Sequence, residues 1–116
     1  MISEGGFYME LDKKIRKLKE KHHEAIQNAK KEIAAIKAEY VRLGYKTDNI
    51  EKKEAEVIEL IKDYFLIVAN QMINRPDISQ YENMANEMER LLSKKKEIIF
   101  KLNYPLMKQK QYKKVS

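Results

Sequence analysis

The chain has 116 residues, enough for a single hydrophobic core, with only three glycines and two prolines. Charged residues make up 36% of it, and this much charge with so few turn residues favours long helices and excludes an ordinary β-sandwich. The absence of cysteine excludes disulfides and thiolate metal sites, and no run of about 18 apolar residues exists to form an ordinary transmembrane helix. We therefore expect an all-α, soluble, cytoplasmic protein with no membrane contact.

The first eight residues, MISEGGFY, precede the helical pattern. Glu4-Gly5-Gly6 can be encoded by the purine-rich run that bacterial ribosomes recognise, and Met9 follows it at a short distance. We therefore predict that residues 1–8 are a disordered leader and that Met9 is the natural start. Together with the excess of lysine over arginine, this favours a bacterial or phage gene.

The first long helical pattern runs from about Leu11 to Leu43. Apolar residues, small residues and one histidine recur at steps of three and four, which places them on one face of a helix. The steps alternate as in a coiled-coil seam, with one irregularity between Leu18 and Ile26. Gly44 follows the pattern, where a left-handed residue commonly ends a helix.

A second helix is predicted from Asn49 or Ile50 to about Asn74. Asp48 and Glu51 have the spacing of a capping box, and the proline at position 76 stops the helix because it disfavours a helical residue before it. The later half of this helix is apolar around most of its circumference. That pattern predicts a central helix, or one covered by a second chain.

The third helix is predicted from about Ser79 to Asn103. Ser79 and Glu82 have the spacing of a capping box, and Asp77 is a rival N-cap two residues earlier. The Tyr104-Pro105 pair ends the pattern, because proline lacks the N–H that a helix interior requires. The residues that follow are mostly basic and polar.

Together these elements predict an antiparallel three-helix bundle or coiled coil, with a helical domain over residues 9–104 and a flexible basic tail over residues 105–116. At about 1.5 Å per residue the first helix would be roughly 50 Å long and the other two roughly 37 Å each, so the start of the first helix would overhang. An exposed apolar stripe is unfavourable on a monomer, so we expect an oligomer, most simply a homodimer. The predicted interface residues are Leu11, Ile15, Leu18 and His22.

Positive charge, which gives the chain a net charge of +6, is concentrated at the start of the first helix and in the tail. These groups either contact another macromolecule, such as the phosphates of a nucleic acid, or only solvate an exposed coiled coil. No base-reading motif accompanies them, so any nucleic-acid binding would be non-specific. The candidate contacts are Lys13, Lys14, Arg16, Lys17 and Lys21 in the helix and Lys108, Lys110, Tyr112, Lys113 and Lys114 in the tail.

We find no pattern that predicts a catalytic, cofactor or metal site. His22 and His23 point about 100° apart on a helix, which is poor geometry for one metal ion. The acidic run of the second helix lacks the Glu-x-x-His pattern of di-iron bundles. The helix order resembles that of small bacterial chorismate mutases, but NIEKKEAEV offers lysines where a forked arginine would be required.

These observations favour a non-enzymatic helical protein that binds another protein, as a regulator, inhibitor or adaptor of bacterial phage or mobile-element type. The alternative is a non-specific nucleic-acid-binding accessory protein that uses the basic patches on the first helix and the tail. A third hypothesis is a purely structural oligomer.

Overall fold

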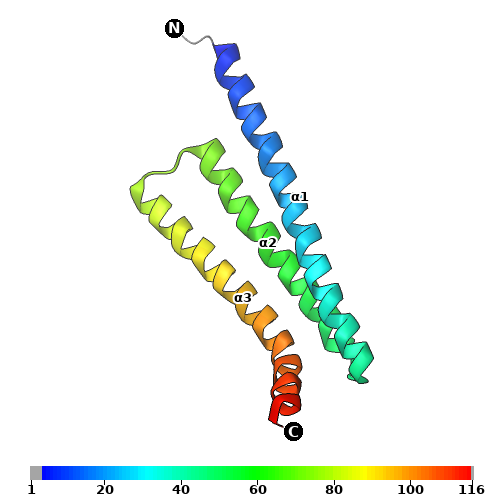
Figure 1. The fold of residues 1–116 in the computed structure, drawn as a ribbon. Helices are drawn as coiled ribbons and strands as arrows, with labels where there is room; N and C mark the ends of the chain where they lie inside the picture. The colour runs from blue at the N-terminus through cyan, green and yellow to red at the C-terminus, as the bar shows by residue number, and fades with distance from the viewer. Residues whose placement is uncertain (1–3, 116) are drawn as a thin grey trace.

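The structure, a computed structural model, describes the backbone of residues 4–115 and the side chains of residues 10–108. This part of the chain forms three helices and no strand: α1 (Glu4–Leu43), α2 (Asp48–Asn74) and α3 (Ile78–Val115). Each helix runs antiparallel to the one before it, so α1 and α3 point the same way, in a bundle that measures 71 × 27 × 25 Å (Figure 1). The predicted all-α fold with three helices is confirmed. None of the described helices has a stretch long and apolar enough to cross a bilayer.

The connection from α1 to α2 is built around Gly44, as the sequence predicts. Gly44 has a φ of 79°, and its N–H donates to the Val41 carbonyl at 3.1 Å. The Tyr45 N–H donates to the Tyr40 carbonyl at 2.8 Å, and the two tyrosine rings meet edge to face at 5.7 Å. This pair of hydrogen bonds, with its accompanying side-chain contact, is a Schellman motif, which ends α1 at Leu43.

Gly44→Ala is expected to lower the free energy of unfolding by about 1 kcal/mol, because a side chain disfavours a left-handed backbone. No atom lies within 4 Å of an added Cβ, so the loss is conformational and not steric. Urea denaturation measures it. Gly44→Asn is the matched control, because asparagine tolerates this conformation, and it should lose less than alanine. Equal losses would contradict the assignment.

The start of α2 differs from the prediction. The helix begins at Asp48, its N-cap is Thr47, and no side chain makes a capping hydrogen bond. Asp48 is therefore already inside the first turn with Glu51, where both acids favour the positive end of the helix dipole. The end of α2 at Asn74 agrees with the prediction, and Arg75 takes a left-handed φ of 43° before the proline.

At the start of α3 the rival cap is the one that forms. The Gln80 N–H donates to Asp77 Oδ1 at 2.8 Å, and the Asp77 N–H donates to Gln80 Oε1 at 3.0 Å. This reciprocal pair is a capping box, and it starts the helix at Ile78. The predicted box of Ser79 and Glu82 is therefore wrong, because both residues already lie inside the helix.

Two helices are longer than predicted. α1 begins at Glu4, so the backbone of residues 4–8 is helical where we expected a disordered leader. Glycine weakens a helix by about 1 kcal/mol but does not end it. α3 continues through Pro105 to Val115, where we expected a flexible tail from residue 105. Its last turns leave the line of the preceding ones (Figure 1), as a proline inside a helix requires.

Two contacts hold α3 to the bundle around this proline. Leu106 packs against the core, and the Tyr40 hydroxyl donates a hydrogen bond to the Leu102 carbonyl at 2.7 Å. A proline at position 105 removes the N–H that would otherwise donate to the Lys101 carbonyl. The contacts with α1 and the core thus explain why α3 does not stop where its sequence predicts.

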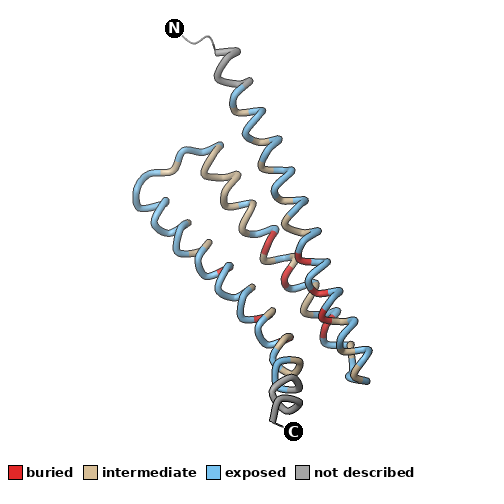
Figure 2. Tube along the Cα trace, viewed as in Figure 1, coloured by how far each residue is buried: buried red, intermediate tan, exposed pale blue. Residues whose placement is uncertain are grey.

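The buried core lies in the half of the molecule that contains the α1–α2 connection (Figure 2). Its most completely buried side chains are Ile33, Ile50 and Val57. No described residue of α1 before Ala29 is buried, and none is buried between positions 62 and 90. The remaining members of this core are Ala29, Ile36, Ile61, Ile98 and Leu102. The bundle is therefore well packed at one end and open at the other.

Candidate functional site

At the open end, the N-terminal half of α1 faces the C-terminal half of α2. The predicted interface residues Leu11, Ile15, Leu18 and His22 lie here, and all of them are only partly buried. The first turns of α1 extend beyond the end of α2, as expected (Figure 1). The four predicted interface residues do not lie in this overhang, because the short connection after Leu43 brings α2 back alongside them, and Leu11 lines a hollow with Met72 and Tyr81. The homodimer therefore stays a prediction, without the overhanging stripe that was its reason.

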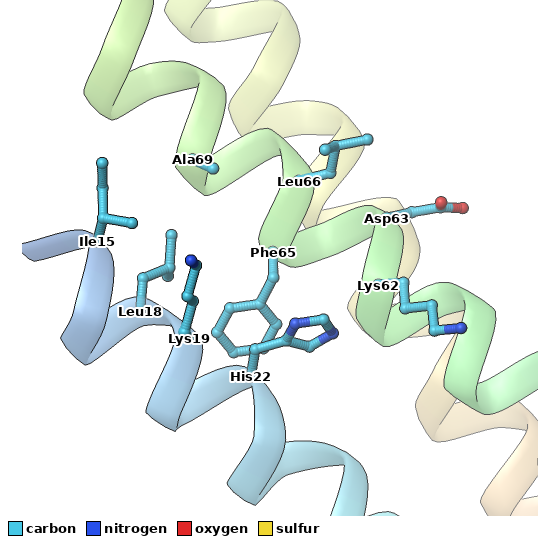
Figure 3. A pocket seen from close by; sticks show the side chains of 9 residues that line it. All are labelled: Ile15, Leu18, Lys19, His22, Lys62, Asp63, Phe65, Leu66 and Ala69. Carbon is cyan, nitrogen blue, oxygen red and sulfur yellow. The ribbon is translucent and has the colours of Figure 1, made fainter.

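On one side of this α1–α2 seam lies a hollow of about 390 Å³ (Figure 3). The His22 ring stacks on Phe65 within it, with the ring centroids 5.0 Å apart and the planes 25° from parallel. His22 Nε2 is buried and has no hydrogen-bond partner among the described residues, so the observed contact of the imidazole is its stacking on Phe65. The hollow is lined by Ile15, Leu18, Phe65, Leu66 and Ala69, with Lys19, Lys62 and Asp63 beside them.

His22 thus fills a layer between two helices of one chain, which agrees with its predicted place in the seam. Its neighbour His23 is exposed. Among the described residues, no group of three or more histidines and carboxylates is arranged to hold a metal ion.

On the other side of the seam lies a larger hollow, of about 560 Å³. Its α1 edge carries Lys14, Lys17 and Lys21, which stand in one row because they recur at steps of three and four. All three are exposed, and within the described part of the chain none of them forms an ion pair. The floor is apolar and aromatic and consists of Leu18, Tyr64, Phe65, Val68 and Met72. We call this hollow with its lysine row the basic groove.

The basic groove continues toward the α2–α3 connection. A smaller hollow of about 240 Å³ shares Lys14 and Met72 with it and extends to Glu10 and Tyr81. From Lys21 to Glu10 the two hollows follow α1 for roughly 17 Å, at about 1.5 Å per residue. That length suits about three turns of a partner helix.

The other predicted contacts are dispersed. Lys13 is exposed outside the groove, and Arg16 is also exposed, in an ion pair with Asp12 at 3.0 Å. Lys108 lies near the C-terminal end of α3, at the opposite end of the molecule from the start of α1 (Figure 1). The side chains of Lys110, Tyr112, Lys113 and Lys114 lie outside the described residues. Of the predicted contacts whose side chains the structure describes, only Lys14, Lys17 and Lys21 lie together in one hollow.

The floor of the basic groove was not among the predicted contacts. Tyr64, Val68 and Met72 belong to the apolar later half of α2, which we interpreted as buried surface. These residues are spaced four apart in the sequence, which places them on one face of α2, and this spacing could have predicted that they act together.

Comparison of the chain with protein-family models, curated proteins and solved structures found no match. The candidate site therefore rests on the geometry and charge of the chain itself.

Proposed function

We propose that the protein is a non-enzymatic regulator, inhibitor or adaptor that binds another protein, and that the basic groove receives an acidic amphipathic helix of that partner. The observation that carries this proposal is the solvent-accessible apolar floor of Tyr64, Phe65 and Val68 beside a row of lysines without ion-pair partners. In helix-in-groove recognition the partner presents apolar anchors at steps of three and four residues. Its carboxylates would face Lys14, Lys17 and Lys21.

The size of the groove favours a reversible contact. Two large side chains entering it would remove roughly 300 Å² of apolar surface from water, about 7 kcal/mol at 25 cal/mol per Å². Association costs about 4–15 kcal/mol in lost freedom, so this burial alone gives weak binding. The lysine row then contributes mainly to selectivity and to the rate of association. Weak, selective binding suits a regulator or adaptor.

The lysine-rich composition supports a protein of bacterial phage or mobile-element type. The alternative function, non-specific binding of nucleic acid, requires the two basic regions to contact one polymer. Lys14 and Lys108 lie toward opposite ends of a molecule 71 Å long, which disfavours a single continuous surface.

A site-specific cross-linker tests the groove and identifies the partner. A photoreactive phenylalanine analogue at Val68, in the groove floor, is expected to cross-link a protein from the source cell's lysate. The same analogue at Leu66, which is 71% exposed and lines the other hollow, should not. The cross-linked protein is identified by mass spectrometry and then purified. Equal cross-linking from both positions would contradict a groove-directed contact.

The purified partner then tests the lysine row. Combining Lys14→Glu, Lys17→Glu and Lys21→Glu should weaken binding by about tenfold or more in calorimetry, because the carboxylates would face like charges. Lys13→Glu, Lys30→Glu and Lys31→Glu change the net charge equally on exposed parts of α1 outside the groove. This control should stay close to the unmodified protein. Similar losses in both variants would indicate diffuse charge attraction and refute the groove.

A further inference from the structure

A second unpartnered surface lies on α3, near its C-terminal end. Phe100, Tyr104 and Met107 are 57%, 53% and 49% exposed, although their helix is already packed in the bundle. Their steps of four and three place them on one face, opposite the buried Ile98 and Leu102 of the same helix. We call these three residues the α3 outer stripe.

Lysines flank the α3 outer stripe on both sides. At about 100° per residue, Lys96 lies within roughly 45° of its centre on one side, and Lys101 and Lys108 lie within roughly 100° on the other. All three are exposed. Glu97 is the only acid between positions 94 and 108, and it pairs with Lys101 at 2.9 Å. Glu97 lies on the same side of the stripe as Lys101 and offsets its charge, so the surroundings of the stripe carry a modest net positive charge.

We propose that the α3 outer stripe docks on the surface of an anionic lipid bilayer. An apolar ridge with cationic flanks is the pattern of helices that lie in the membrane interface, where apolar side chains enter the headgroup boundary. Lysines beside such a ridge extend along it and contact lipid phosphates. In this arrangement the protein lies on the membrane and does not span it. The proposal therefore does not require a membrane-spanning helix, and none is found among the described residues. Our expectation of no membrane contact considered only spanning segments.

The geometry favours a lipid surface over other anionic partners. The Phe100 and Tyr104 rings are 6.3 Å apart and inclined at 46° to each other, whereas a platform for single-stranded nucleic acid presents ring faces on which successive bases stack. Met107 adds apolar surface that a phosphate backbone would not contact. A second copy of the chain would bring the flanking lysines of both copies face to face, which is unfavourable.

Vesicle sedimentation tests the proposal with the full chain. We expect it to sediment with vesicles of phosphatidylcholine and phosphatidylglycerol but not with phosphatidylcholine alone, and added salt should weaken the binding. Combining Phe100→Ser, Tyr104→Ser and Met107→Ser should reduce binding about tenfold, because the apolar ridge is lost. The matched control combines Leu66→Ser, Ile73→Ser and Ile78→Ser, which remove comparably exposed apolar side chains at the open end. This control should bind as the unmodified chain does.

A fluorescence measurement locates the contact. The chain has no tryptophan, so Tyr104→Trp introduces a single reporter. Its emission should shift to the blue on anionic vesicles, while that of Tyr81→Trp, at the other end of α3, should not. Absent sedimentation, or equal binding by the stripe variant, would overturn the proposal. Binding to a single-stranded oligonucleotide without binding to vesicles would overturn it in favour of nucleic acid. Combining Lys14→Ala, Lys17→Ala and Lys21→Ala lowers the net charge only from +6 to +3, so this variant should retain most of the vesicle binding, which separates this result from the fate of the basic groove.

Discussion

Ile33→Ala is expected to lower the free energy of unfolding by about 3 kcal/mol, whereas Ile15→Ala should lower it by about 1 kcal/mol or less. Both substitutions remove the same atoms from α1. The Ile33 side chain is 1% exposed inside the core, so its loss leaves a cavity in close-packed surroundings. Ile15 is only partly buried and lines a hollow, so folding removes less of its apolar surface from water than it does for Ile33.

Urea denaturation followed by circular dichroism measures both losses. Val57→Ala, which truncates a fully buried residue of α2, should resemble Ile33→Ala more than Ile15→Ala. Native-state hydrogen exchange gives a second measurement, because amides near Ile33 should exchange more slowly than those near Ile15. Equal losses in the free energy of unfolding from Ile33→Ala and Ile15→Ala would mean that the bundle is packed evenly along its length. The basic groove would then be an ordinary part of its core.

The uneven packing connects stability with the proposed function. At the core end, α1, α2 and α3 all contribute buried residues, as Ile36, Ile61 and Leu102 do. At the open end the apolar floor of the basic groove remains accessible beside its lysines. A partner that fills the groove would bury this surface and stabilise the folded state by mass action. The open end is then a binding surface whose exposure lowers the stability of the isolated chain.

Some of these features follow from the sequence because a local rule determines them. Gly44 was predictable since the turn needs a left-handed residue, and the end of α2 was predictable from the proline that follows Arg75. The cap of α3 was less determined, because Asp77 and Ser79 both satisfy the capping rules. Asp77 is the N-cap in the structure, because the two capping hydrogen bonds form between it and Gln80.

Other features depend on packing that no local rule describes. The row of Lys14, Lys17 and Lys21 follows from helical spacing alone, but their place at the edge of an apolar floor does not. That floor stays accessible because no described side chain of α3 lines the hollow above Val68. The sequence of α2 is apolar whether or not a neighbour covers it, so periodicity predicts burial in both cases.

Pro105→Ala is expected to raise the free energy of unfolding by about 2 kcal/mol, because alanine restores an N–H to the interior of α3 and removes the clash of the proline ring. Urea denaturation measures the gain, and circular dichroism should show a small increase in helix content. A loss of stability would mean that the bend at Pro105 is needed to place Leu106 against the core. A helix truncation at residue 104 would be the wrong control, because it removes Leu106 as well.

Tyr40 provides the coupled variant. Tyr40→Phe removes the hydroxyl that donates to the Leu102 carbonyl and should cost about 1 kcal/mol. Burial, and secondarily the charge of Tyr45, raises the pKa of Tyr40 above its usual value. The neutral phenol therefore stabilises the fold below its unfolded pKa of about 10, and this contribution is lost as the pH rises through the higher folded pKa. Tyr40→Phe should therefore lose less stability at alkaline pH than the unmodified chain does.

The combination of the two substitutions distinguishes a local contact from a clamp on the bent helix. If the Tyr40 hydroxyl compensates for the turn that Pro105 disturbs, Tyr40→Phe should cost less in the Pro105→Ala background than in the unmodified chain. If the two effects simply add, the hydrogen bond is an ordinary contact between α1 and α3. In the first case the contact from Tyr40 is what allows α3 to continue as a helix beyond the proline, where Met107 of the α3 outer stripe lies.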